Sequence, residues 1–166
     1  NAEGPRVVAW EVTRRCPLAC KHCRAGAQDR AYEHELSTED CMRVMDSLAQ
    51  FSRPMIIWTG GEPMYRPDII DLVRYATNKG LRSVMTPCGT LVTRESLMAL
   101  KQAGVMACSF SVDGATAASH DAFRCVPGAF DNVSAAMAIA REIDMPFQVN
   151  TTVSQLNQAE LPAIRE

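Results

Sequence analysis

The sequence lacks several features that mark whole classes of protein. It has no basic excess: the formal net charge is -2 and the isoelectric point is near 5.9, so no positive footprint indicates nucleic-acid binding. No apolar run approaches the roughly 20 residues that a membrane-spanning helix needs. The first residues show no secretory signal, and no glycine-rich phosphate loop of the G-x-G-x-x-G or Walker type occurs. We therefore expect a cytoplasmic protein that binds neither nucleic acid nor membrane.

The ends of the chain carry a separate expectation. The sequence begins without methionine, and residues 1–2 (Asn-Ala) resemble the remnant of a cleaved affinity tag. We expect residues 3–166 to form one domain, because 166 residues is an ordinary length for a single domain and no linker or low-complexity segment interrupts the chain.

Cysteine is the residue type whose pattern stands out. Three of the seven cysteines, Cys16, Cys20 and Cys23, form a compact C-x3-C-x2-C group, and the other four stand alone. An odd number cannot pair completely and nothing indicates secretion, so a reducing compartment and a metal or catalytic role fit better than a disulfide scaffold. Of the isolated cysteines, Cys41 and Cys108 lie in apolar patterns and are predicted to be buried core residues.

Short apolar runs alternate with amphipathic segments along the chain. Strands are predicted at 6–12, 54–61, 81–89, 105–114 and 145–153, and helices at 36–51, 66–80, 93–104, 129–144 and 157–166, with a loop at 115–128. This alternation predicts an α/β fold with a parallel sheet, built from about five βα units. The continuous apolar strands indicate a sheet covered on both faces. Two architectures fit, an open doubly wound sheet and a partial TIM-type (βα) barrel.

Every unusual polar or glycine-rich stretch follows a predicted strand. The cysteine group follows the first strand, TGGEP the second and TPCGT the third, while SVDG ends the fourth strand and NTT lies late in the fifth. Parallel strands place their carboxyl ends on one face, where α/β enzymes build their sites. We therefore expect these five stretches to surround one site.

Three clustered thiols leave several chemistries open. A structural zinc site, with His22 as a further ligand, is one alternative, and a disulfide with a spare thiol is another. A four-iron cubane cluster is the third, because three thiolates hold three irons and leave the fourth open to another ligand. Four neighbouring cations would offset the negative charge of such a cluster and favour thiolates: Arg14, Arg15, Lys21 and Arg24.

The C-x3-C-x2-C group after the first strand and GGEP after the second resemble the radical S-adenosylmethionine (SAM) superfamily. This resemblance covers roughly residues 7–153. It implies that Cys16, Cys20 and Cys23 ligate a [4Fe–4S] cluster and act as the catalytic residues, and that SAM is the ligand of the fourth iron. It further implies reductive cleavage of SAM to a 5′-deoxyadenosyl radical that abstracts hydrogen from a substrate.

The same resemblance implies a set of SAM-binding residues. The GGEP motif, residues 60–63, would hold the SAM amino group, and His22 would abut the adenine. Positions in the fourth and fifth strands would meet the ribose and the methionyl end, and an arginine would lie near the SAM carboxylate. Of these, Ser111 and Asp113 would meet the ribose and the methionyl end, and Asn150 and Thr152 would line the SAM pocket. The complete set is His22, Gly60, Gly61, Glu62, Pro63, Ser111, Asp113, Arg124, Asn150 and Thr152.

Longer stretches are similar to the branch of haem and haem d1 biosynthesis enzymes, with pyrroloquinoline-quinone and peptide-modifying enzymes nearby. This implies a tetrapyrrole substrate, or alternatively a peptide or another small molecule, and a flavodoxin- or ferredoxin-like electron donor. Related cores usually have six βα units, so we expect an incomplete core with an open barrel edge. We expect this edge to have a partner, through a second copy, edge pairing or exchanged elements. Cys88 and Cys125 are candidate extra ligands or reactive thiols.

Two other readings remain open. One is a non-catalytic iron–sulfur or metal-binding (βα) module, and the other is an open α/β nucleotide-binding protein whose cysteines are incidental.

Overall fold

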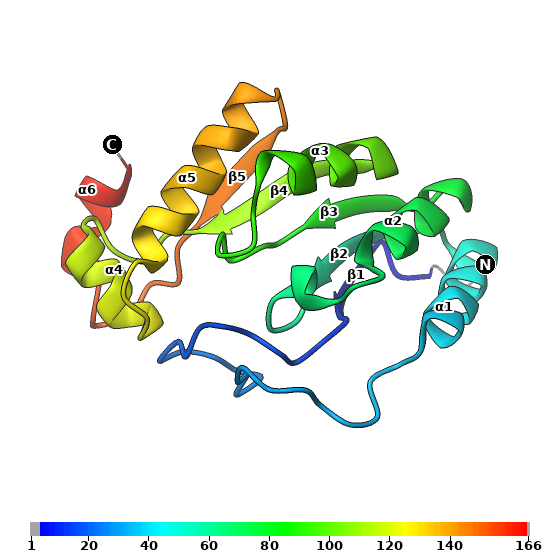
Figure 1. Ribbon diagram of the computed structural model, residues 1–166, viewed down its shortest axis with the longest axis horizontal. Coiled ribbons are helices and arrows are strands. Elements are labelled where there is room, and N and C mark those ends of the chain that lie inside the picture. Colours follow the sequence, from blue (N-terminus) through cyan, green and yellow to red (C-terminus); the bar gives the residue numbers. More distant parts are fainter. Residues whose placement is uncertain (1–3, 166) are drawn as a thin grey trace.

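A single parallel sheet organises the chain (Figure 1). The computed structural model describes residues 4–165, so the predicted tag remnant at residues 1–2 lies outside the described residues. The strands are β1 (Val7–Glu11), β2 (Met55–Thr59), β3 (Arg82–Met85), β4 (Val105–Ser111) and β5 (Phe147–Asn150). All four neighbouring pairs are parallel.

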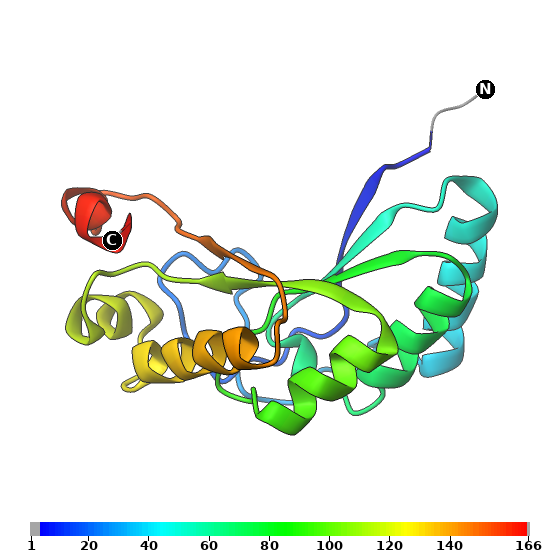
Figure 2. The ribbon, with the colours of Figure 1, turned by 90° about the horizontal axis from the view of Figure 1, so that it is seen from above.

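The spatial order of the strands decides between the two predicted architectures. The order is β1-β2-β3-β4-β5, which is the order of the sequence. A doubly wound sheet reverses direction at a switch point, and this sheet has none. Figure 2 shows the sheet curving, with helices on its convex side. The prediction of a partial (βα) barrel is therefore confirmed, and the doubly wound alternative is wrong.

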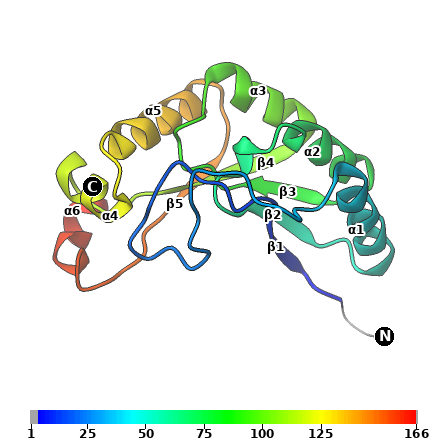
Figure 3. The ribbon, with the colours of Figure 1, turned by 60° about the horizontal axis from the view of Figure 1, so that its bottom comes forward.

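The four longest helices form one outer layer along the sheet (Figure 3). The covering helices are α1 (Thr38–Phe51), α2 (Ile69–Asn78), α3 (Arg94–Ala103) and α5 (Ala129–Glu142). The shorter elements are η1 (Pro63–Tyr65), α4 (Ala117–Arg124), η2 (Gln158–Glu160) and α6 (Leu161–Arg165). Within residues 4–165 no helix is long and apolar enough to cross a membrane.

The main core lies between the sheet and this helical layer. In β2 burial alternates, with Ile56 and Trp58 fully buried and the other three residues half-buried. Both edge strands are largely exposed, with Val7 in β1 and Val149 in β5 about half accessible. The expectation of strands covered on both faces is therefore wrong, because all covering helices lie on one side and the other face is the concave interior of the partial barrel.

Capping residues fix several of the helix ends. Ser37 caps α1 by accepting a hydrogen bond from the backbone N–H of Asp40, and Gly104 ends α3 in a left-handed conformation (φ 114°). The predicted loop at 115–128 instead contains α4, which Thr116 and Ser119 begin with reciprocal capping hydrogen bonds. The predicted last helix is reduced to η2 and the five-residue α6.

Candidate functional site

The cysteine loop, residues 12–30, connects β1 to the segment that precedes α1 and lies at the carboxyl ends of the strands (Figure 1). Its cysteines differ in exposure: Cys16 is buried, while Cys20 and Cys23 are half-buried. The fold therefore places the thiols at the end of the sheet where the sequence predicts the site.

The first half of the loop is fixed to the end of β2. The backbone N–H of Gly61 donates to Thr13 O at 2.7 Å, and that of Glu62 donates to Arg15 O at 2.7 Å. A Cβ on Gly60 would lie 2.2 Å from Thr13 O, and one on Gly61 would lie 2.3 Å from Arg15 O. Both glycines therefore permit the close approach of the cysteine loop itself, a role beyond the ligand contact expected from the sequence.

The second half of the loop is fixed to the last turn of α4. The backbone N–H of Ala19 donates to Arg124 O at 3.2 Å, and that of Lys21 donates to Phe123 O at 3.1 Å. The ring of His22 lies against Phe123 with centroids 4.8 Å apart. Carbonyl groups at the end of a helix have no intrahelical partner, and the loop provides partners for these two. Sequence reasoning missed α4, although the T-x-x-S spacing before it is a weak capping signal.

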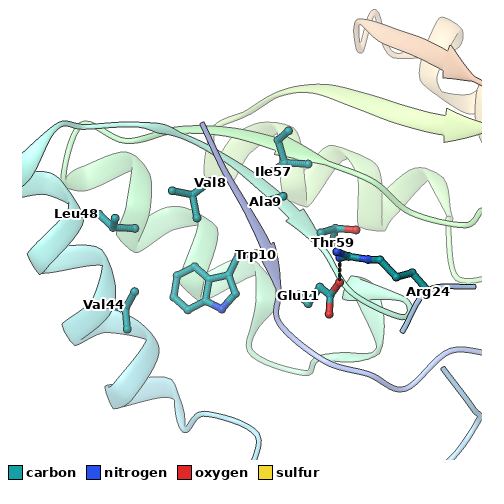
Figure 4. Close-up of a pocket in the computed structure, with 9 residues that line it drawn as sticks. All are labelled: Val8, Ala9, Trp10, Glu11, Arg24, Val44, Leu48, Ile57 and Thr59. Atoms are coloured by element: carbon teal, nitrogen blue, oxygen red, sulfur yellow. Dashed lines mark hydrogen bonds and ion pairs between the residues drawn. The ribbon is translucent and has the colours of Figure 1, made fainter. Parts of the chain in front are cut away.

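The loop is also closed on itself and tied to β1. The backbone N–H of Cys16 donates to Gln28 O at 3.2 Å, and the Cys23 thiol accepts from the backbone N–H of Ala27 at 3.4 Å. Arg24 reaches back to Glu11 at the end of β1, with 2.6 Å between Nη2 and Oε1 (Figure 4). These contacts hold the three thiols around one space.

That space is a cavity of about 370 Å³, within the range of small-ligand sites. It collects residues from the cysteine loop, from the ends of β2 to β5 and from α4. The predicted site residues that line it are Cys16, Cys20, His22, Cys23, Gly60, Gly61, Ser111, Arg124 and Asn150. Glu62, Pro63, Asp113 and Thr152 do not line it. Cys88, a candidate extra thiol, lines the cavity as well, whereas Cys125 lies outside it and is exposed.

Two of the predicted residues outside the cavity, Glu62 and Thr152, are hydrogen-bonded to neighbouring segments. Glu62 is fully buried, and its carboxylate accepts from the backbone N–H of Met64 at 2.9 Å and of Cys88 at 2.6 Å. Burial raises the pKa of Glu62 well above its ordinary value. Thr152 is exposed, and its backbone N–H donates to Asp113 Oδ1 at 2.7 Å. The proposed contacts of these two side chains with SAM stay predictions.

Arg124 contacts both the cysteine loop and a buried carboxylate. Its Nη1 lies 3.5 Å from Cys20 Sγ, and its Nη2 lies 2.5 Å from Asp113 Oδ2. The side chains of Arg124 and Asp113 are 10% and 0% exposed. Arg124 Nε and Asp113 Oδ2 have no hydrogen-bond partner among residues 4–165, so the pair is an ion pair without hydrogen-bond alignment. A positive charge therefore lies beside the thiols in a buried setting.

The thiols themselves have unequal environments. A hydrogen bond from the Cys88 thiol lowers the pKa of Cys16, and burial raises the pKa of Cys20 against the opposing effect of Arg124. All seven cysteines are free thiols, so the disulfide alternative is wrong in this structure. Within the described chain, no three His, Cys, Asp or Glu side chains converge on a point where a single metal ion could be held. Cys41 and Cys108 are fully buried in the core, as predicted.

A larger cavity, of about 700 Å³, runs along β1 and α1 (Figure 4). Val8, Trp10, Val44 and Leu48 form its apolar part, and the ion pair between Arg24 and Glu11 lines it as well. It adjoins the cysteine cavity but contains no thiol. We assign the candidate functional site to the smaller cavity because the three clustered thiols and the buried Arg124 gather there.

Known proteins resemble this chain over nearly its whole length. The model of the Radical SAM superfamily matches residues 10–165. An AdoMet-dependent heme synthase of Nitratidesulfovibrio vulgaris is 50% identical over 95% of this chain and 46% of its own length. A PqqA peptide cyclase of Rhodopseudomonas palustris is 34% identical over 98% of this chain and 43% of its own length. Both branches named from the sequence are therefore found among the relatives.

A solved structure shares the fold. Streptococcus suis SuiB bound to S-adenosylmethionine has a TM-score of 0.75 with this chain at 16% identity, covering 95% of this chain and 37% of its own. The chain spans less than half the length of these relatives.

Proposed function

The chain belongs to the radical SAM superfamily, and on that premise we propose that its cysteine cavity holds a [4Fe–4S] cluster and SAM. The observation that supports this most directly is the gathering of Cys16, Cys20 and Cys23 around one cavity together with the buried cation Arg124. Three thiolates and one nearby guanidinium suit a group that is anionic once ligated. The donor set therefore fits a cluster with one iron left for SAM.

The proposed roles of the protein groups follow from their positions. The three thiolates hold the cluster, and the carboxyl ends of β2, β4 and β5 provide the opposite wall, where Ser111 and Asn150 line the cavity. Asn150 Nδ2 donates to Ser109 Oγ at 2.8 Å, which fixes this amide at the wall. When bound there, the cluster would supply the low-potential electron for reductive cleavage of SAM, and the 5′-deoxyadenosyl radical so formed would abstract hydrogen from a substrate.

For the whole protein we propose a role in haem or tetrapyrrole cofactor biosynthesis. The relative named as a haem synthase is 50% identical, compared with 34% for the peptide cyclase, and this difference favours a tetrapyrrole substrate over a peptide. The electron donor would be a flavodoxin- or ferredoxin-like protein.

We also propose that the open edges of the sheet pair with another polypeptide, such as a second copy of this chain. Among residues 4–165, β1 and β5 each pair with one strand, and Val149 in β5 and Val153 after it are 46% and 59% exposed. Sedimentation should then give a mass above that of one chain. A compact, well-folded monomer at micromolar concentration would contradict edge pairing between copies.

The test of the main proposal is anaerobic reconstitution of the chain with iron and sulfide, followed by addition of SAM and dithionite. We expect iron and sulfide equivalent to one [4Fe–4S] cluster per chain, and 5′-deoxyadenosine detected by chromatography. The matched pair of variants is Cys20→Ala, which should take up no intact cluster, and Cys125→Ala, which should load normally because this thiol is exposed outside the cavity. A cluster that forms but yields no 5′-deoxyadenosine would instead indicate a non-catalytic iron–sulfur module.

A further inference from the structure

Arg124 is the side chain that connects the cysteine loop to Asp113, a buried residue just after β4. Its guanidinium lies between one sulfur atom and one oxygen atom: Nη1 is 3.5 Å from Cys20 Sγ, and Nη2 is 2.5 Å from Asp113 Oδ2. Because a guanidinium remains protonated in proteins, Arg124 places a permanent positive charge beside Cys20, one of the proposed cluster ligands.

Asp113 fixes the position of that charge. Its Oδ1 accepts the backbone N–H of Thr152 at 2.7 Å, and its own backbone N–H donates to Nδ1 of the buried His120 at 3.1 Å. The carbonyl of Asp113 accepts from the Asn157 side chain at 3.1 Å. The carboxylate is therefore held rigidly, so it can both anchor the guanidinium and offset part of its charge.

The backbone reinforces the same connection. The carbonyls of Phe123 and Arg124 accept hydrogen bonds from Lys21 and Ala19. Cys20 lies between these two donors. Its thiol is consequently held against Arg124 by backbone contacts on both sides, which makes the 3.5 Å contact a consequence of the loop's docking and not of one flexible side chain.

We propose that Arg124 and Asp113 form a charge pair that sets the reduction potential of the cluster through Cys20. This inference rests on the proposed cluster and goes beyond the SAM-carboxylate contact that the family resemblance implies for Arg124. Reduction adds one negative charge to the cluster, so a nearby positive charge stabilises the reduced form, and a nearby negative charge opposes it. Hydrogen bonds to ligand sulfurs act in the same direction as the positive charge.

The two partners should consequently have opposite effects. Arg124→Gln removes the cation and leaves the buried carboxylate, which lowers the potential. Asp113→Asn removes the carboxylate and leaves the cation beside Cys20, which raises it. Arg124→Lys keeps the charge without the planar fork and should lie closer to the unsubstituted chain than Arg124→Gln. If the two residues had only a structural role, both substitutions would shift the reduction potential in the same direction, or neither would shift it.

The experiment is a redox titration of the reconstituted chain without SAM, followed by electron paramagnetic resonance of the reduced cluster. Omitting SAM removes any effect of a carboxylate contact. At a fixed solution potential, we expect the ratio of reduced to oxidised cluster in Arg124→Gln to be about tenfold lower than in the unsubstituted chain. This corresponds to a reduction potential lower by ~59 mV for a one-electron couple. Arg30→Gln is the matched control, because Arg30 is exposed, bonds the Gln28 side chain and does not line the cavity.

The outcomes separate this inference from the function it rests on. If the unsubstituted chain forms no cluster, the proposed function fails first. If it forms one and Arg124→Gln has an unchanged potential, the charge-pair inference is overturned while the function stands. If Arg124→Gln retains no cluster, Asp113→Asn tests the charge-pair inference. A reduction potential above that of the unsubstituted chain supports the inference, and an equal or lower potential overturns it.

Discussion

Replacing Gly61 by alanine tests whether the GGEP motif docks the cysteine loop. The added Cβ would lie 2.3 Å from Arg15 O and 2.6 Å from Arg14 O. Both neighbours are backbone atoms, so no rotamer change relieves the contact. The loop would have to retreat by about 1 Å in a close-packed region.

That retreat sets the size of the effect. It would stretch the two 2.7 Å hydrogen bonds that Gly61 and Glu62 donate to the loop. Each such bond contributes about 1 kcal/mol, and overpacking costs about 1–3 kcal/mol more. We expect Gly61→Ala to lower the free energy of unfolding by about 3 kcal/mol, a large part of the roughly 5–15 kcal/mol typical of a domain.

Urea unfolding of the cluster-free chain measures the loss, and iron content after reconstitution measures its effect on loading. Gly128→Ala is the matched control: Gly128 also precedes a helix and has φ 81°, but its Cβ would meet nothing within 4 Å. It should lose only about 1–2 kcal/mol, from the left-handed conformation, and keep its iron. The docking role would be refuted if Gly61→Ala were no less stable than Gly128→Ala and bound as much iron.

Three further predictions concern other parts of the chain. First, Cys23→Ala should abolish iron binding, whereas Cys108→Ala, at a fully buried core position, should lose stability but still bind iron; equal iron contents would contradict the assignment. Second, burial lowers the pKa of His120 below its usual 6.5, so the neutral ring stabilises the fold above pH 6.5 and this contribution is lost as the pH falls through the lower folded-state pKa. His120→Asn keeps an acceptor for the Asp113 N–H, and it should reduce the change in unfolding free energy with pH, measured by urea titrations at several pH values. An unchanged pH dependence would contradict this role of His120. Third, Cys125 ends α4 with φ 58°, so Cys125→Gly should raise stability by up to about 1 kcal/mol, measured as a higher melting temperature; a lower one would contradict the strain argument.

The fold was largely predictable because its signals are local. Alternation of apolar runs with amphipathic segments identified the five strands, and the four helices of the covering layer begin and end within three residues of their predicted bounds. The same reasoning missed α4, whose short segment lacks an acidic first turn and is capped by Thr116 and Ser119. It also gave the strands a second covering layer, because an apolar strand does not reveal whether its other face meets a helix or a barrel interior.

The candidate site was predictable in its residues but not in its connections. Nine of the predicted residues line the cavity because strand ends in a parallel sheet share one face. The Arg124–Asp113 ion pair and the hydrogen bond from the backbone N–H of Cys88 to Glu62 were not predictable, since both depend on side-chain geometry that a sequence pattern does not encode. The glycines of GGEP illustrate the same limit: sequence indicates a close approach, and only the structure shows that the approaching group is the cysteine loop.

The docking of the cysteine loop on α4 has a consequence for biosynthesis. The Cys20 thiol and Arg124 are 104 residues apart in sequence, so the loop cannot complete its contacts when it first leaves the ribosome. At roughly 5–20 residues per second, α4 follows only about 5–20 s later. During that interval the three thiols are unprotected by their final fold. If the cluster were inserted before α4 is synthesised, the cysteine loop would lack its contacts with α4. If iron and sulfide were delivered after α4 has emerged, the loop would already be docked and the three thiols would be in their final positions.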